Sequence, residues 1–305
     1  MATPTGVPPS SSSSSHTAPP PPDGQVLSLV SALSSVQNHE LHVQAIRARD
    51  EALSSSPETY SNLCLQMSCV LAGTDRPSEM LQRMGPAHVE QFRQTDPANA
   101  ANLQQNAHLW THFGQLAGLI LKEALLHPPI LQTQQRVLNV ISPAADHLKN
   151  VLLYSLGCVH EELRNVASTI IATTAVSADS VQPQLSLPAW PQLIPTLLGN
   201  LQQSSNVPLV EGSLSTIRKM MEDGPHELRQ DQLDSLVPVL LRFLSATDER
   251  TKLNALQSLE ACLSEGLMPS ALVALFDSYL GSLSGLATDP SPAVRKWVCR
   301  SIVTL

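Results

Sequence analysis

The stretch Asp289–Leu305, DPSPAVRKWVCRSIVTL, joins a proline-containing turn to the apolar spacing of an amphipathic helix. The turn Asp289-Pro290-Ser291-Pro292 is typical of a helix start. After it, apolar residues recur at helical intervals, at Val294, Trp297, Val298 and Ile302. The stretch therefore predicts a helix over Pro292–Leu305 with one buried face, and with Arg295 beside that face.

The same plan, a turn followed by a helix with a charged residue near its start, occurs three more times upstream. The charged residues are spaced by 47, 41 and 43 positions and are Arg164, Glu211, Lys252 and Arg295. A second column agrees, because LIPTLL around Pro195 and LVPVLL around Pro238 are 43 positions apart. A shared period of about 40–47 residues with two helices per period predicts a HEAT- or armadillo-type repeat array. The alternative, chance recurrence in a leucine-rich chain, does not explain why prolines and charges repeat in register.

The predicted fold is all-α, an α-solenoid of about six HEAT repeats over residues 24–305. The composition agrees, with 42% hydrophobic and only 3% aromatic residues in the 305-residue chain. The last predicted helix has no polar cap, and solenoids need capping repeats. We therefore expect the array to be truncated at its C-terminal end. We expect Pro191 in the first turn of a helix and Pro195 one turn further in, where a proline bends a helix.

Two regions depart from the repeat plan. Residues 1–23 are rich in proline and serine and are expected to be disordered, because they cannot bury enough apolar surface. Residues 72–107 interrupt the helical pattern with Gly85-Pro86 and Asp96-Pro97. They predict an inserted loop, with a short helix at Met80–Met84.

Several function classes are disfavoured. The net charge of −8 and the absence of a lysine- or arginine-rich run argue against nucleic-acid binding. No apolar run reaches the ~18–20 residues that a membrane span needs. The five cysteines lie in apolar helical stretches without a CxxC pair, and we expect them to be buried free thiols of a reducing compartment.

Catalytic signals are also weak. His108 and His112 lie one helical turn apart, as two metal ligands could, but no third ligand follows them. Core or surface histidines are the favoured interpretation. No glycine-rich phosphate loop and no nucleophile–base pair is evident. The sequence therefore predicts a protein that is not an enzyme and that uses no cofactor.

Particular motifs now point to a family. Gly118–Lys122 (GLILK), Trp190–Pro195 (WPQLIP) and Val294-Arg295-Lys296 occur in order along the chain. Together they resemble the second, fourth and sixth repeats of the transportin (karyopherin-β2) branch of the importin-β nuclear transport receptors. The resemblance covers roughly residues 24–305. The insertion at 72–107 and the small number of repeats depart from the family pattern.

The resemblance implies a partner surface. In this family the N-terminal arch binds the small GTPase Ran in its GTP form, through the inner helices of the first repeats. The candidate Ran-binding residues on those helices are Arg47, Asp50, Glu51, Gln115, Lys122, Glu123 and Glu162. Each could instead be an ordinary solvated side chain.

The column Arg164, Glu211, Lys252 and Arg295 is interpreted as a structural ladder between stacked inner helices, with ligand binding as the alternative. Glu211 has the sign needed to bridge Arg164 and Lys252. Exposed ion pairs contribute only about 0–1 kcal/mol each, so such a ladder would specify register more than stability.

The implied function is a nuclear import receptor that shuttles between cytoplasm and nucleus through the nuclear pore. Ran-GTP binding would release nuclear-localisation-signal cargo that is held by a C-terminal arch missing from this chain. Nucleoporins are possible further partners, and the receptor is expected to be a monomer. The alternatives are a generic HEAT-repeat scaffold or adaptor, or a fragment without function.

Overall fold

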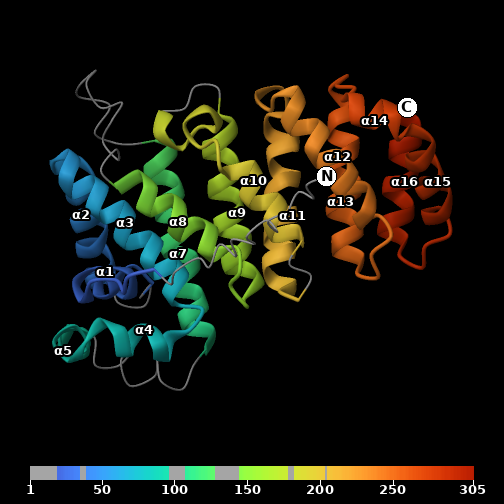
Figure 1. Ribbon diagram of the computed structural model, residues 1–305. Coiled ribbons are helices and arrows are strands. Elements are labelled where there is room, and N and C mark those ends of the chain that lie inside the picture. The colour runs from blue at the N-terminus through green and yellow to red at the C-terminus, as the bar shows by residue number, and fades with distance from the viewer. Residues whose placement is uncertain (1–18, 35–38, 96–106, 128–143, 178–181, 203–204) are drawn as a thin grey trace, which may run out of the picture.

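The computed structural model describes residues 19–34, 39–95, 107–127, 144–177, 182–202 and 205–305, and within these ranges the regular secondary structure is entirely helical. Figure 1 shows the helices side by side in an elongated array that runs from the N-terminal to the C-terminal end. The predicted all-α class is confirmed.

The helices of the array follow the predicted alternation. The first half contains α1 (Gly24–Ser34), α2 (His39–Ser55), α3 (Pro57–Gly73), α7 (Ala107–Leu126), α8 (Ala145–Ser155) and α9 (Glu161–Val176). The second half contains α10 (Leu193–Gln202), α11 (Val207–Asp223), α12 (Gln230–Phe243), α13 (Glu249–Ser264), α14 (Ser270–Ala274), α15 (Phe276–Leu286) and α16 (Pro292–Thr304). The third predicted outer helix, Gln132–Gly157, is described only at α8; its interruption at Ser142-Pro143 lies outside the described residues.

The helices stack in two rows. The inner row contains α1, α7, α9, α11, α13 and α16, and the outer row contains α2, α3, α8, α10, α12, α14 and α15. One cluster of buried apolar side chains runs through the array from Leu27 to Val298. Each helix therefore buries its apolar face against its neighbours, as a solenoid requires, which confirms the predicted fold class.

The first helical pair, α1 and α2, is arranged differently from the later pairs. Along the rest of the array the second helix of each pair joins the inner row. At the N-terminal end α1 packs beside α7, whereas α2 packs mainly on α1 and α3. The expectation that Arg47, Asp50 and Glu51 lie on an inner helix is therefore wrong, because they belong to α2.

Side-chain caps define where several helices start. Asn206, Asp248 and Ser291 each accept a hydrogen bond from the backbone N–H three residues later, at 3.3, 2.8 and 3.3 Å. Such caps satisfy donors that a helix leaves unpaired at its first turn. The predicted start of α16 at Pro292 is confirmed.

The buried face of α16 differs in part from the prediction. Val294 and Val298 are buried, Ser301 is buried one turn further on, and Trp297 is partly buried. Ile302 is 54% exposed, so its expected place in the core is wrong. The reason is that the face of α16 that packs on α13 continues through Ser301, and the next residue, Ile302, lies outside that face.

The repeated prolines occupy different positions in their helices. Pro195 is the third residue of α10, where the missing N–H would have no helical partner anyway, so it lies in the first turn and need not bend the helix. Pro191 precedes the helix, which corrects its predicted first-turn place. Pro238 lies inside α12, as predicted for an interior proline.

The region expected to be an inserted loop contains two helices, α4 (Pro77–Met84) and α5 (Pro86–Thr95). The expected short helix at Met80–Met84 is the second part of α4. Gly85, with φ of 81°, forms the turn between them, a backbone conformation that glycine adopts without steric cost. Helix α4 packs on α3 and α5 packs on α1, below the array in Figure 1.

The prediction that residues 1–23 are disordered can be compared with the structure only at residues 19–23. Residues 1–18 lie outside the described residues. Pro19–Asp23 is placed, with Pro19 and Pro22 buried, and Pro19, Pro20 and Pro21 lie beside residues of α3, α4 and α8.

Among the described glycines, Gly212 of α11 has the closest backbone neighbour. A Cβ added there would come within 2.3 Å of the Leu156 carbonyl oxygen, in the turn between α8 and α9. Backbone atoms cannot move aside as a flexible side chain can. Glycine at this position therefore sets how closely α11 approaches the preceding pair.

Gly212→Ala is expected to lower the free energy of unfolding by about 1–3 kcal/mol, because it overpacks this contact. The matched control is Gly199→Ala in α10, where an added Cβ would meet nothing within 4 Å. Alanine should there be neutral or stabilise by up to about 1 kcal/mol. Thermal and urea unfolding followed by circular dichroism checks both, and equal stabilities of the two variants would contradict the assignment.

Candidate functional site

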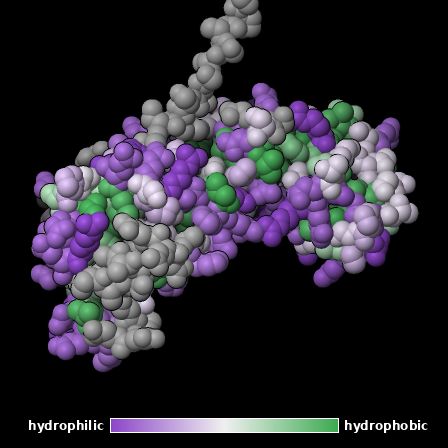
Figure 2. All heavy atoms as spheres, turned by 90° about the horizontal axis from the view of Figure 1, so that it is seen from below, coloured by the Kyte–Doolittle hydropathy of each residue, from purple (hydrophilic) through white to green (hydrophobic). Residues whose placement is uncertain are grey.

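A polar groove of about 380 Å³ crosses the inner row over α9, α11 and α13. Its charged lining residues are Glu161, Arg164, Glu211, Arg218 and Arg250, with Asn165 and Asn254 among the neutral ones. Figure 2 shows hydrophilic residues over much of the visible surface and an outline hollowed between the two ends. The groove thus presents both signs of charge on three consecutive inner helices.

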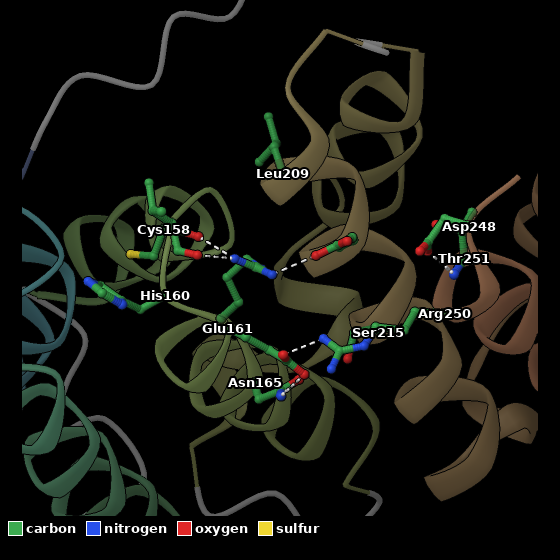
Figure 3. A network of polar contacts seen from close by, with 12 residues as sticks. Cys158, His160, Glu161, Asn165, Leu209, Ser215, Asp248, Arg250 and Thr251 are labelled. Atoms are coloured by element: carbon green, nitrogen blue, oxygen red, sulfur yellow. Dashed lines mark hydrogen bonds and ion pairs between the residues drawn. The ribbon is translucent and has the colours of Figure 1, made fainter. Parts of the chain in front are cut away.

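Arg164 anchors one wall of the groove. One guanidinium nitrogen, Nη1, donates to the carbonyl oxygens of Cys158 and Val159 at 2.8 and 2.7 Å. The other, Nη2, donates to Glu211 Oε2 at 2.5 Å. Figure 3 shows this network between α9 and α11. Because the Arg164 side chain is only 8% exposed, these bonds satisfy a charge that water scarcely reaches.

A second ion pair crosses the groove from α13 to α9. Arg250 binds Glu161, which also accepts a hydrogen bond from Asn165 at 3.4 Å (Figure 3). The hydrogen bond from Arg250 lowers the pKa of the Glu161 carboxyl, and the same bond raises the pKa of Arg250. The pair bypasses α11, so it joins the third helical pair to the fifth. Since both side chains are largely exposed, it adds little to stability.

The residues of the predicted charge column make contacts in two separate groups. Arg164 pairs with Glu211 as expected. Lys252 does not bridge to Glu211; its Nζ lies 2.5 Å from Asp289 Oδ2. Arg295 donates to the carbonyl oxygens of Asp289 and Pro290 at 2.6 and 3.0 Å. The expected Glu211–Lys252 rung is therefore wrong, because Lys252 reaches toward the next turn along the array.

One arginine arrangement occurs twice. Arg164 and Arg295 each bind the backbone carbonyls six and five residues earlier, in the turn before their helix. An arginine presents several donors in a fixed plane, which suits two adjacent acceptors. This geometry is consistent with the presence of arginine at both of these positions of the column.

The seven candidate Ran-binding residues fall into two groups. Arg47, Asp50 and Glu51 are exposed on α2, which belongs to the outer row. On the inner row, Gln115 and Lys122 of α7 are half-buried, whereas Glu123 of α7 and Glu162 of α9 are exposed. The first group lies on a different row from the second.

The sequence analysis missed Lys219 of α11. Its Nζ donates to Asn165 O, Ser168 Oγ and Thr169 Oγ1 of α9 at 3.0, 2.6 and 2.8 Å. Burial, with a smaller contribution from neighbouring Arg218, lowers the pKa of Lys219 to about 8. The sequence did contain one indication of this contact. Lys219 follows Glu211 and Ser215 at intervals of four residues, which places all three side chains on one side of α11.

The described residues hold no group of three or more histidine, cysteine or acidic side chains that could bind a metal ion. His108 and His112 are both exposed on α7. Four cysteines are buried, and burial raises the pKa of the Cys64 and Cys69 thiols to about 12 and that of Cys262 to about 11. Such thiols are poor nucleophiles. Cys299 is exposed, which corrects its expected burial.

Among the described helices, none combines the length and apolar character needed to cross a membrane.

The Lys252–Asp289 pair gives an acid-dependence prediction. The hydrogen bond from Lys252 holds the pKa of Asp289 below its ordinary value, with help from the Ser291 N–H. A lowered carboxyl pKa stabilises the fold above the unfolded value of about 3.9, and this stabilisation is lost as the pH falls through the folded value. Wild type should therefore melt above Asp289→Asn at pH 7, and the difference should shrink toward pH 3. A difference that does not change with pH would argue against the pair. Asp277→Asn, in exposed surroundings on α15, is the control.

Lys219 gives a second pH-dependence prediction, in the alkaline range. Its folded pKa of about 8 lies below the ordinary value of about 10.4, so the unfolded chain binds more protons between these values. Stability relative to Lys219→Met should therefore rise between pH 8 and 10, by an amount on the order of 2 kcal/mol. Urea unfolding of both proteins at several pH values measures the difference, and a flat difference would show that Lys219 titrates normally.

Comparisons with known proteins give a consistent set of relatives. The chain is 28% identical to a transportin of Dictyostelium discoideum over 202 residues, which cover 65% of this chain and 20% of that protein. It is 28% identical to human Transportin-1 over 62% of this chain and 20% of that protein. It is 31% identical to Transportin-1 of Oryza sativa subsp. japonica over 60% of this chain and 19% of that protein. No protein-family model matches the chain.

Among solved structures, a designed armadillo repeat protein in complex with the peptide (KR)4 covers 92% of this chain and 99% of its own, with a TM-score of 0.45 and 15% identity. The chain spans about a fifth of the length of the curated relatives that it matches. The motif-based resemblance is confirmed: over about 60% of its length, this helical-repeat chain is similar to transportins.

Proposed function

We propose that the chain acts as the N-terminal arch of a transportin-type nuclear import receptor, and that it binds the small GTPase Ran in its GTP form. The observation that carries the proposal is the agreement among relatives from Dictyostelium, human and rice, all named as transportins, over about a fifth of each. The stacked inner row supports it, because α7 and α9 present the polar residues Gln115, Lys122, Glu123 and Glu162, beside the exposed Leu119, to a folded partner.

The proposed partner surface is the inner row from α7 to α9, with Gln115, Lys122, Glu123 and Glu162. The polar groove over α9, α11 and α13 continues this surface toward the C-terminal end. The side chains carry both signs of charge, which suits a partner recognised by charge pattern as well as by shape. Arg47, Asp50 and Glu51 lie on the outer row and are proposed to be outside the contact.

The proposed mechanism is reciprocal coupling between two ligands. Cargo bearing a nuclear-localisation signal would bind elsewhere on the receptor in the cytoplasm. In the nucleus, Ran-GTP bound to this arch would lower the affinity of the receptor for that cargo. Nucleoporins would carry the receptor through the nuclear pore. The contribution of this chain would be an array whose helices share one apolar core, through which binding on the inner row could be coupled to the rest of the receptor.

The test is retention of nucleotide-loaded Ran on the immobilised 305-residue chain. Ran loaded with a non-hydrolysable GTP analogue should be retained, and Ran loaded with GDP should not. Lys122→Glu combined with Glu162→Arg should weaken retention by about tenfold, which corresponds to about 1.4 kcal/mol. Asp50→Arg combined with Glu51→Arg, on exposed outer-row positions, is the matched control and should have little effect.

Two outcomes would contradict the proposal. Equal retention of the two nucleotide forms, or none, by a chain with a helical circular dichroism spectrum would favour a scaffold without GTPase selectivity. A larger loss from the α2 variants than from the α7–α9 variants would keep Ran binding but would move the surface to the outer row.

A further inference from the structure

The first described segment of the chain, Pro19–Asp23, lies in a groove made by other elements and is called the N-terminal strap below. Each of Pro19, Pro20 and Pro21 is both a proline and the residue before a proline. Both constraints favour the polyproline II conformation. Pro19 and Pro22 are buried while Pro20 is exposed. This pattern matches the three residues per turn of a polyproline II helix, which puts Pro19 and Pro22 on one side.

The groove is built from the end of α3, from α4 and from α8. Its lining beneath the prolines includes Gly73, Arg76, Glu79, Met80, Arg83 and Tyr154. Met80 is buried and provides an apolar floor, Tyr154 provides a half-buried aromatic ring, and the rim carries both signs of charge. The space left between prolines and groove is only about 20 Å³, roughly one water molecule. Proline-rich segments are generally recognised in aromatic-lined grooves of this character.

The strap has a defined end. The Asp23 N–H donates to Gln66 Oε1 of α3 at 2.7 Å, and the Asp23 carboxylate lies 3.8 Å from His88 Nδ1 of α5. The contact with Gln66 uses the backbone N–H of Asp23, whereas the Asp23 carboxylate accepts a hydrogen bond from the Gln25 N–H at 2.9 Å and so caps the start of α1. These contacts fix the direction in which a proline-rich segment lies in the groove.

The walls do not depend on the strap alone. Met80 packs directly on Gly73, where an added Cβ would lie 2.5 Å from Met80 Sδ. Helix α4 packs on α3 and on α5, and α5 packs on α1. The groove is therefore held by helix contacts that remain when the prolines leave it. This arrangement also gives a role to α4 and α5, which stand outside the repeat plan.

We propose that this groove is a polyproline-recognition site. The strap is its intramolecular ligand, and it competes with a proline-rich segment of a partner protein. A ligand on a short tether has an effective concentration in the millimolar range. A partner segment of ordinary affinity therefore binds only when the strap is weakened or displaced. The strap in this way sets the threshold for binding.

The experiment uses a fluorescein-labelled peptide with the sequence of residues 18–24, APPPPDG, and fluorescence anisotropy with the full chain. Pro19→Ala combined with Pro22→Ala removes both buried rings from the strap. This variant should bind the peptide at least tenfold more tightly than wild type. Pro20→Ala, which changes a ring that borders the groove but is exposed, is the matched control and should have a much smaller effect.

The groove itself is tested in the background of the weakened strap. Tyr154→Ala and, separately, Met80→Ala should each reduce peptide affinity at least tenfold, and a peptide with its first and fourth prolines replaced by alanine should not bind. Circular dichroism establishes that each variant is folded. If the double strap variant does not fold, Pro19→Ala alone takes its place.

Three outcomes would overturn the proposal. They are equal affinity of wild type and the strap variant, affinity that does not change with Tyr154 and Met80, and no binding by a folded strap variant at peptide concentrations up to the millimolar range.

Discussion

The approach of α11 to the turn between α8 and α9 is the constraint on which the inner row depends. Gly212 lies against the Leu156 carbonyl, and no other residue leaves room for that approach. Because protein interiors are close-packed, the distance between two helices is set by the side chains at their contact. This one contact therefore also brings Glu211 within reach of Arg164 and Lys219 within reach of three oxygens of α9. The polar groove exists because its helices are held at this spacing.

The charged residues along the inner row serve different purposes according to their burial. Lys252 and Asp289 are almost fully buried, at 11% and 7% side-chain exposure, so either one alone would leave an unpaired charge away from water. Arg250 and Glu161 are largely exposed, and their pair contributes little to stability. The buried pair thus connects α13 to the turn before α16 away from water, whereas the exposed pair lies at the surface of the groove.

The two surfaces with proposed partners are carried by different elements. The inner-row surface lies on α7 and α9 and continues into the groove over α9, α11 and α13, whereas the polyproline groove lies between α3, α4 and α8. All of these helices contribute to one continuous apolar core. A variant on either surface can therefore be judged for folding by the same helical signal and for binding by its own ligand.

The sequence by itself determined the class of fold, the helix pairs and the relationship to transportins. These features follow from local rules: apolar residues at helical spacing, turn residues with capping side chains, and a repeated period. For this reason α9 and α13 begin just before the charged residues that marked them, at Glu161 before Arg164 and at Glu249 before Lys252. The sequence also identified Arg164 and Glu211 as partners, since their charges and spacing agree.

Only the tertiary structure decided how the parts meet. Lys252 could have faced Glu211 or Asp289, and the choice depends on the rotation of α13 against α16, which no local pattern encodes. The placement of α2 in the outer row depends on how the first pair packs on α3 and α7. The sequence predicted disorder for the strap because proline and serine lack apolar periodicity, yet Pro19 and Pro22 are buried, and Pro19 lies beside residues of α3, α4 and α8. The burial that orders such a segment comes from residues far away in the chain, and so it is visible only in the folded protein.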